Sequence, residues 1–496
     1  MTLGCLPCDL ASTTRCTVGH ALACLLGLGL MGCRIPNHSP PLPEPVLHET
    51  APASPVPPAK QPSEVHSLPK VNSPYNAVIV DELPTPAEAP GSTISLAEAI
   101  RETLEADPRI RAGSETIKQA EAELWTASLL PNPELLTDIS YLPLTRPFTI
   151  EKPGGPPELD IYLFFPIDWL VFGKRSAHVQ SARAGVDVAT AEYADLIRQR
   201  VAGTVTAYYD LAEALAKLAL AREELESLKR LQAITRERVQ AGRAEATEGD
   251  RIRSAVAEGQ RDVRHREAAV VTERAALRAP LGRKDCDREP NVEVALEVHD
   301  PVPPPPVEEV WQLADQHRPD ILALRLRIAK AEADLRYEHK KGYPELKPRV
   351  IFIRQFQEKV EGVPDASSYA LGTEVGLPIF DRNQGNVSKA ESVLTQSIFT
   401  REAQLAHFRA NIEEVVADYR VAYADVLANT LEEVQADRAE RDKAEAAYRA
   451  GKKPLAEVLE AQHTYRDSAK RAVTEQASYW KALHRLNAAV GKPVFQ

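Results

Sequence analysis

The sequence has 496 residues, a formal net charge of -11, 44% hydrophobic residues and 26% charged residues. The acidic balance argues against nucleic acid as the main partner, and the single short apolar run near the start excludes a bundle of transmembrane helices. The length suggests about three globular domains, yet aromatic residues are only 6% while prolines number 39. We therefore expect that much of the chain does not fold as compact globules.

The N-terminus has the pattern of a targeting segment. The apolar run Ala21–Leu30 has the length of a secretory signal and is too short to span a bilayer comfortably. The sequence Leu30-Met31-Gly32-Cys33 resembles a bacterial lipoprotein cleavage site, in which the cysteine becomes the acylated first residue of the mature chain. We predict a lipoprotein signal peptide over residues 1–32 and lipidation at Cys33; an ordinary signal peptide and a misassigned start are the alternatives.

The next segment, residues 33–94, is predicted to be a proline-rich tether. Fifteen of the 39 prolines lie between Pro36 and Pro90. Such a composition favours extended polyproline geometry and cannot bury a core. The mature chain keeps Cys33 and Cys286; if Cys33 is acylated, Cys286 has no cysteine to pair with, so we expect no disulfide to stabilise the fold.

The remainder of the chain contains one unit twice. Asp107–Leu135 aligns without a gap with Arg318–Leu346 at an offset of 211 residues, and Gly242 corresponds to Gly451 at an offset of 209. Both glycines are predicted to form turns that join long helices. The predicted boundaries are 95–290 for the first repeat, 291–306 for a proline-rich linker and 307–496 for the second repeat.

Within each repeat we predict a short helix, a second helix, two strands, a very long helix, a glycine turn and another long helix. About 65 helical residues correspond to roughly 100 Å of helix. In the second copy the apolar residues after Ile398 recur at steps of three and four, which is a coiled-coil seam. The seam residues are Leu405, Phe408, Ile412, Val415, Tyr419, Ala422 and Val426. The predicted helices are Ser95–Ala106, Arg109–Ser128 and Gly173–Gln240 in the first copy, and Val307–His317, Asp320–Lys340 and Asn386–Arg449 in the second.

The predicted strands alternate in polarity. From Tyr369 to Leu377 every second residue is large and apolar or threonine, and the residues between them are small or acidic. Leu135–Tyr141 alternates in a similar way, whereas Tyr162–Phe165 and Val350–Phe356 are less regular. This pattern is typical of a transmembrane barrel, although each segment alone also fits a soluble sandwich. Four strands cannot close a barrel, so several chains would have to share one.

Five segments together resemble the TolC-type outer-membrane factor family of bacterial efflux and secretion systems. They are Phe165–Arg175 and Leu377–Asn386, which resemble its strand-to-helix junctions, Tyr448–Gly451 and Leu455–Gln462, which resemble its periplasmic helix turn, and His317–Ile321, which resembles the start of its second repeat. The similarity extends over about residues 95–492.

This resemblance implies a mostly α fold with a small β part. Three chains would form a homotrimer with a long α-helical coiled-coil barrel and a shared 12-stranded transmembrane β-barrel. The protein would be a passive exit duct in the outer membrane that extends into the periplasm. Its partners would be a periplasmic adaptor, an inner-membrane pump of the RND type and outer-membrane lipid, with no nucleic acid.

The resemblance implies neither an enzyme nor a cofactor, and the 12 histidines show no metal-ligand spacing. The sequence does not identify the exported cargo. Two alternatives stay open, a periplasmic coiled-coil structural or adaptor lipoprotein and the duct of a type I protein secretion system.

Candidate gating residues follow the second glycine turn. Glu457 and Glu460 are three residues apart and lie on one helical face, so a trimer would present two stacked rings of carboxylates, which favour cations in a narrow pore. The resemblance implies that these residues ring the closed aperture, that Tyr448 and Lys453 link neighbouring coils, and that Glu248 is the acidic acceptor. The chain has Glu where the family has Asp, and a solvated helix face is the alternative for each residue.

Overall fold

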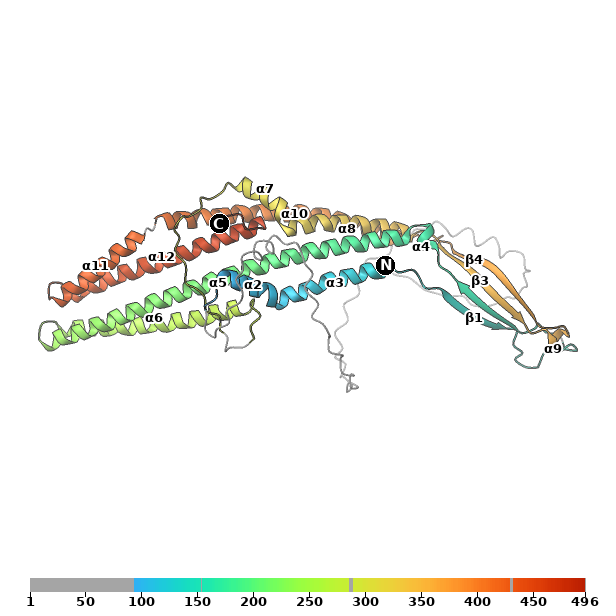
Figure 1. The fold of residues 1–496 in the computed structure, drawn as a ribbon, viewed down its shortest axis with the longest axis horizontal. Helices are drawn as coiled ribbons and strands as arrows, with labels where there is room; N and C mark the ends of the chain where they lie inside the picture. Colours follow the sequence, from blue (N-terminus) through green and yellow to red (C-terminus); the bar gives the residue numbers. More distant parts are fainter. Residues whose placement is uncertain (1–92, 153, 285–288, 429–430, 496) are drawn as a thin grey trace, which may run out of the picture. The chain divides into compact units, whose positions relative to one another are not determined.

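A computed structural model describes residues 93–152, 154–284, 289–428 and 431–495. The chain divides into two units, Met1–His66 and Ser67–Gln496, and all described residues belong to the second. The predicted signal peptide, Cys33 and almost all of the predicted tether lie outside the described residues. Figure 1 shows the long helices and the strands of the second unit.

The elements follow the same order in both halves of the described chain. The first half contains α2 (Leu96–Ala106), α3 (Pro108–Ser128), β1 (Glu134–Ser140), β2 (Glu158–Phe164), the short α4 (Asp168–Val171), α5 (Lys174–Gln240) and α6 (Ala246–Arg278). The second half contains α7 (Val307–His317), α8 (Pro319–Lys341), β3 (Glu345–Gln355), the short α9 (Glu358–Glu361), β4 (Ala366–Gly376), α10 (Gln384–Ala428), α11 (Leu431–Arg449) and α12 (Leu455–Val490). The helix predicted as Asn386–Arg449 thus corresponds to α10 and α11, which flank residues 429–430.

Local sequence explains where the helices begin. Ser95 caps α2, because its hydroxyl accepts the amide of Glu98 while the Glu98 carboxylate accepts the amide of Ser95 at 2.8 Å. The matched prolines Pro108 and Pro319 occupy the first turn of α3 and α8. A proline is favourable there because its fixed φ suits a helix start and its missing N–H has no helical acceptor.

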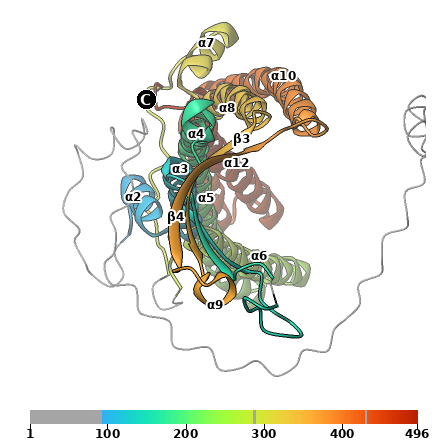
Figure 2. The same cartoon turned by 90° about the vertical axis from the view of Figure 1, so that its right-hand side faces the viewer.

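The helices form a continuous row across the two repeats. On the side nearer the sheet, α3 packs on α5, α5 on α8 and α8 on α10. Figure 2, which looks along the helices, shows these four elements side by side. At the far ends, α6 packs on α5, α5 on α12 and α12 on α11. The 67-residue helix α5 therefore contributes to both groups.

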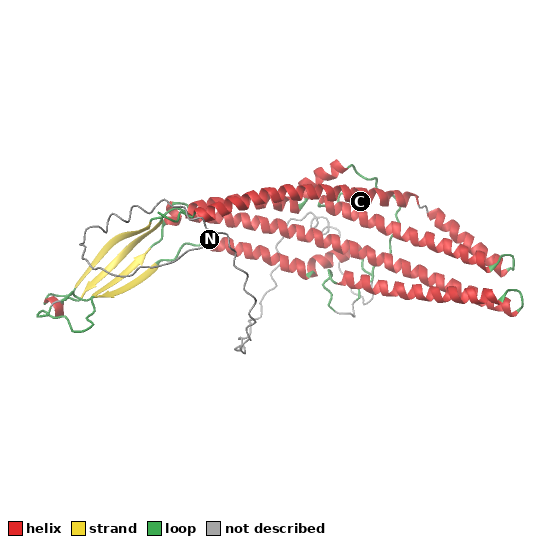
Figure 3. Ribbon diagram, turned by 180° about the vertical axis from the view of Figure 1, so that it is seen from behind, coloured by secondary structure: helices red, strands yellow, loops and turns green. Residues whose placement is uncertain are grey.

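The four strands form one antiparallel sheet in the order β1-β2-β3-β4. Strand β3 pairs with β2 of the other repeat, with Phe352 opposite Ile161. The less regular predicted strands are longer than expected and span Glu158–Phe164 and Glu345–Gln355. Strand β2 is paired along its whole length with β1 and β3, and β3 is paired along its whole length with β4. In the helices that the structure describes, no stretch is long and apolar enough to cross a membrane. Figure 3 distinguishes the strands from the helices.

Apolar burial confirms part of the predicted seam of α10. Ile412, Tyr419 and Ala422 are buried, whereas Leu405, Phe408, Val415 and Val426 are half-buried. On α5, Val201, Val205 and Tyr208 are buried. The expectation for Ile398 differs, since this side chain is 48% exposed in the single chain. The buried stripe of α10 begins at Ile412, so Ile398 lies outside it.

Charged groups of α5 connect it to the starts of both repeats. Arg200 pairs with the fully buried Asp107 at 2.6 Å, and Arg198 pairs with Asp320 at 3.4 Å. Arg318 pairs with the same Asp320 at 2.6 Å. Removing one partner of such a buried pair is costly, because the remaining charge loses its compensation.

The proline-rich linker predicted over 291–306 is packed against the helices. The backbone amide of Val302 donates to the hydroxyl of Tyr479 at 2.8 Å, and the hydroxyl of Tyr419 donates to the carbonyl of Val302 at 2.7 Å. Trp480 donates to the carbonyl of Leu296 at 3.1 Å. The linker therefore has fixed contacts with α10 and α12.

A histidine on α12 should make the stability of the helical body depend on pH. His484 lies against the ring of Tyr209, and burial lowers the pKa of His484 to about 4. A lowered pKa means that the unfolded state binds a proton more readily, so stability is lost as the pH falls from about 6.5 toward 4. We expect His484→Gln to reduce the drop in apparent Tm over this range, measured by circular dichroism. The control is His463→Gln at an exposed position, which should retain the slope of the native protein. Equal slopes for all three proteins would contradict the role of His484.

Candidate functional site

The two glycine turns have the same backbone geometry. Gly242 and Gly451 adopt φ values of 67° and 77°. In the first turn the amide of Arg243 donates to the carbonyl of Arg238 at 2.8 Å, and in the second the amide of Lys452 donates to the carbonyl of Ala447 at 2.9 Å. These bonds and the positive φ define a Schellman ending, in which glycine avoids the strain of a left-handed residue. The predicted helix-tip turns are thus located at both glycines.

The hydroxyl of Tyr448 connects the second tip to the first. Tyr448 is fully buried at the end of α11, and its hydroxyl lies 3.0 Å from Thr235 of α5. The same hydroxyl donates to the carboxylate of Glu248, in the first turn of α6, at 3.0 Å. Burial raises the pKa of Tyr448, so the hydroxyl remains a donor at neutral pH. The sequence prediction of a Tyr448–Glu248 contact agrees with this geometry.

Arg238 forms the other half of this contact. Its guanidinium lies over the ring of Tyr448, 4.2 Å from the ring centre, and donates to the carbonyl of Tyr448. A cation over an aromatic face is attracted by the ring quadrupole, by about 0.5–2 kcal/mol. That carbonyl belongs to the last turn of α11 and also accepts the amide of Gly451 at 2.9 Å, so the guanidinium is its second donor. One residue of α5 therefore caps the helix of the other repeat.

The remaining predicted gating residues line an exposed groove of the second tip. Glu457 and Glu460 are both exposed and face the same groove, together with Asp437 and Glu440 of α11. Lys453 pairs with Glu457 of its own coil at 3.0 Å. The link from Lys453 to a neighbouring coil stays a prediction, since in the single chain this side chain pairs with Glu457, four residues further along.

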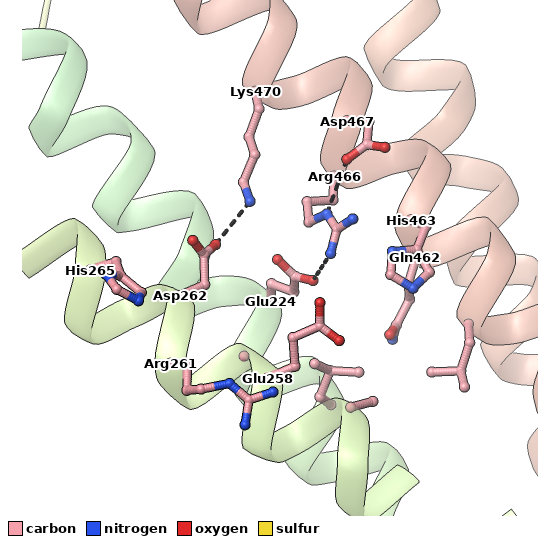
Figure 4. Close-up of a pocket in the computed structure, with 14 residues that line it drawn as sticks. Glu224, Glu258, Arg261, Asp262, His265, Gln462, His463, Arg466, Asp467 and Lys470 are labelled. Atoms are coloured by element: carbon pink, nitrogen blue, oxygen red, sulfur yellow. Dashed lines mark hydrogen bonds and ion pairs between the residues drawn. The ribbon is translucent and has the colours of Figure 1, made fainter. Parts of the chain in front are cut away.

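A cavity of about 400 Å³ lies above the tips, between α5, α6 and α12. Figure 4 shows Lys470 reaching across it to Asp262 at 2.9 Å and Arg466 reaching Glu224 at 3.3 Å. Burial raises the pKa of Glu224, and the charge of Arg466 partly opposes that rise. These pairs join the α5–α6 hairpin to α12. They form a second set of contacts between the repeats.

Sequence reasoning missed Thr235, Arg238 and the ion pairs of the cavity. Arg238 lies four residues before Gly242, one turn from the predicted helix end. A basic residue at this position is typical of a helix C-terminus and could have indicated that Arg238 interacts with the turn. Its aromatic partner is 210 residues away, so the spacing along the chain did not indicate the contact. No group of metal-ligating side chains large enough to hold an ion occurs among the residues described.

The chain matches the family described as Outer membrane efflux protein over residues 99–283 and 310–492. The chain belongs to this family. The two matched segments correspond to the two halves of the fold, with a break at the packed linker. Members are outer-membrane channels of tripartite efflux systems that work as homotrimers with a periplasmic adaptor and an inner-membrane pump, and they are channels rather than enzymes.

Individual proteins support this assignment. The Cobalt-zinc-cadmium resistance protein CzcC of Cupriavidus metallidurans is 24% identical over 383 residues, which is 76% of this chain and 85% of the relative. The Campylobacter jejuni outer membrane channel CmeC has a TM-score of 0.67 at 16% identity, covering 88% of this chain and 94% of CmeC. The outer membrane protein VceC of Vibrio cholerae has a TM-score of 0.62 at 18% identity, covering 80% and 96%. These similarities confirm the predicted TolC-like fold.

Substitution of the second tip glycine tests the turn geometry. The space beside Gly451 is open, so Gly451→Ala meets no clash and its cost comes from the left-handed backbone alone. We expect a loss of about 1–2 kcal/mol in the free energy of unfolding measured with denaturant. The control Gly249→Ala also meets no neighbouring atom, but it lies inside α6 and should be neutral or stabilising. Equal effects of the two substitutions would contradict the assigned turn.

Proposed function

We propose that the two glycine tips form the periplasmic aperture of the efflux channel and that contacts between the repeats hold this aperture closed. The observation that supports the proposal is the Tyr448 hydroxyl, which bonds Glu248 of the other repeat at 3.0 Å. If the aperture opens by separation of the two hairpins, this bond breaks first, since both partners lie at the tips. Arg238 adds a second contact at the same place.

The strength of these contacts suits a reversible closure. A hydrogen bond to a charged group contributes about 1.5–3 kcal/mol, and a cation on an aromatic face contributes about 0.5–2 kcal/mol. Shifting an equilibrium from mostly closed to mostly open needs about 5.5 kcal/mol of differential binding. A bound adaptor can supply this amount through an interface of ordinary size. The aperture of the free channel is thus closed, and the aperture of the channel with a bound adaptor is open.

Glu457 and Glu460 have a different proposed role. Both carboxylates are exposed in the single chain and lie in a groove with two further acidic residues, Asp437 and Glu440. In a trimer, three copies of this groove around one axis present rings of negative charge. Such rings attract cations and repel anions in a narrow pore. Lys453 neutralises part of this charge through its pair with Glu457.

The rest of the chain fits a passive conduit. We infer that the protein catalyses no reaction and that an inner-membrane pump of the RND type supplies the energy. Cys33 is proposed as the lipid anchor, with residues 33–94 as the tether between that anchor and the first repeat. The boundaries proposed for the repeats remain 95–290 and 307–496. Family membership favours the exit duct over a periplasmic structural lipoprotein.

Removal of the Tyr448 hydroxyl tests the closure. We expect Tyr448→Phe to raise the conductance of the purified trimer in planar bilayers, with an open fraction about 10–150-fold higher, because the hydrogen bonds to Glu248 and Thr235 are lost. Glu248→Gln retains an acceptor without charge and should give a smaller increase.

The matched control is Tyr465→Phe. The ring of Tyr465 also lies against an arginine, Arg441, at 4.3 Å, but in the described chain its hydroxyl makes no hydrogen bond. Its conductance should equal that of the native protein. A closed Tyr448→Phe channel, or an equal increase for both variants, would show that this hydroxyl does not hold the aperture.

Removal of the exposed carboxylates tests the ring. We expect Glu457→Ala combined with Glu460→Ala to lower the preference for cations over anions, because the four acidic groups of the groove become two. The measurement is the reversal potential under a salt gradient. The control is Glu432→Ala combined with Glu433→Ala at the start of α11, which also removes two carboxylates. An unchanged selectivity in the first variant is incompatible with the proposed ring.

The cargo is a second proposal. We infer that the exported substrates are divalent metal cations, because the relative CzcC is described as a cobalt-zinc-cadmium resistance protein and matches over 85% of its length. The proposed acidic aperture would favour such cations. A strain lacking the protein should be sensitised to cobalt, zinc or cadmium salts and not to organic drugs. Sensitivity to drugs alone, or loss of a secreted protein, would assign a different cargo.

A further inference from the structure

The two faces of the sheet differ in polarity. One face is mostly apolar and exposed, with Tyr369 at 76% and Leu371 at 83% exposure. Because side chains alternate along a strand and residues that pair across strands share a face, the register assigns every charged strand residue except Arg354 to the other face. These residues are Glu134, Asp138, Glu158, Asp160, Glu345, Lys347, Arg349 and Glu374. In an outer-membrane channel the apolar face of the strands contacts lipid and the polar face borders the pore, so we call the polar face the pore face.

Arg349 of β3 lies on the pore face at the end of the sheet that is nearer the helices. It belongs to a row of paired residues, Glu134, Phe164, Arg349 and Gly372, which starts at the first residue of β1 and includes the last residue of β2. The guanidinium carbon lies 5.6 Å from the ring centre of Tyr162 and 5.9 Å from that of Phe164. A cation near two aromatic faces is attracted by both rings. The contacts with β2 therefore restrict where this guanidinium can lie.

Gly372 of β4 makes room for the side chain of Arg349. A Cβ atom at position 372 would lie 3.1 Å from Nε and 3.6 Å from Cγ of Arg349. Glycine inside a strand commonly marks such a close approach. The arginine side chain thus lies between the rings of β2 and the bare backbone of β4, on the surface that borders the pore.

In the part of the chain that the structure describes, Arg349 has no ion pair. The side chain is half-buried, and its Nε is buried without a hydrogen-bond partner. The other cation of the pore face, Lys347, pairs with Glu134 at 3.0 Å. A partly buried charge without a counter-ion is unfavourable, and a guanidinium presents a planar fork of donors that suits two oxygens of one anion. An oxyanion in the pore would supply both the counter-charge and the acceptors.

We propose that Arg349 is an oxyanion-binding site of the pore, which takes phosphate, sulfate or carboxylate groups. The homotrimer would carry three copies of this site around one axis, at the helix-proximal end of the strands. The carboxylates of Asp138 and Asp160 lie four residues further along β1 and β2, away from the site. A bound oxyanion offsets the charge of cations that pass outward through the pore. The proposal rests on the channel function of the family and is independent of the proposed aperture.

Binding of inorganic phosphate to the purified full-length trimer tests the site. We expect the phosphorus NMR resonance of phosphate to broaden in the presence of the native protein. Arg349→Gln should weaken the apparent affinity at least about tenfold, because charge-assisted hydrogen bonds are lost. The matched control is Arg354→Gln on the opposite face of the same strand, where Arg354 pairs with Asp365 at 3.6 Å. This control should keep the native affinity.

Two further variants separate a specific site from the general field of the pore. Lys347→Gln removes one charge from the same face and should weaken the affinity by only about threefold, since Lys347 acts on the anion from a distance through water. Arg349→Lys keeps the charge without the planar fork and should fall between the native protein and Arg349→Gln. Each variant is used only as a trimer recovered from the outer membrane, which excludes a folding defect.

Ion selectivity provides a second measurement on the same variants. Under a salt gradient in planar bilayers, Arg349→Gln should increase the preference for cations over anions, because a cationic ring favours anions and has been removed. Arg354→Gln, which faces lipid, should leave the reversal potential unchanged.

A loss of phosphate affinity in Arg349→Gln that exceeds those of Arg354→Gln and Lys347→Gln supports the site. Equal losses in these variants, or native protein that does not broaden the phosphate resonance, overturn it, and so does an unchanged reversal potential of Arg349→Gln. A carboxylate of a neighbouring copy on Arg349 would give the second of these results. The phosphate resonance does not depend on whether the aperture is open, so a failure of the proposed aperture leaves this test valid.

Discussion

The structure depends on the burial of two sides of one long helix. Helix α5 has buried residues from Ala177 to Thr235, along almost its whole 67-residue length. It packs on α3 and α6 of its own repeat and on α8 and α12 of the other. A helix with one apolar stripe requires one partner layer, whereas α5 requires elements from both repeats. Neither repeat can therefore bury its apolar residues without the other.

This dependence determines how the tips are held. Because α5 reaches the far end of the molecule beside α12, its last turns lie against the second hairpin, and Arg238 contacts Tyr448 there. The apolar side chains of this region form one cluster from both repeats, including Leu231, Ile252 and Val458. The polar contacts above the cluster are few and involve single side chains. A small number of bonds thus controls the separation of two long hairpins.

The repeats are equivalent in fold and unequal in chemistry. Asp107 and Arg318 occupy matched positions with opposite charges, and each pairs with a group of the other sign. At the tips, Glu248 and Glu457 are matched at an offset of 209, but Tyr448 corresponds to Val239. The tyrosine contact therefore exists once per chain, at the junction inside the protomer. Duplication preserved the apolar positions, because packing requires them, while side-chain contacts diverged.

The sequence by itself determined the order of elements, both glycine turns and part of the coiled-coil seam, because these follow from local periodicity and backbone preference. It also identified Tyr448 and Glu248 through a family resemblance.

Only the tertiary structure decided the strand ends and the side-chain contacts between residues that are far apart in the sequence. Neighbouring strands determine where each strand ends, since β3 pairs with β2 of the other repeat from Arg349 to Gln355 and with β4 along its whole length. In the single chain, Lys453 pairs with Glu457, four residues further along. Arg238, Thr235 and the ion pairs of the cavity join residues more than 200 positions apart. Such contacts form only when the helices pack side by side, because the separation of two residues along the chain does not indicate their distance in space.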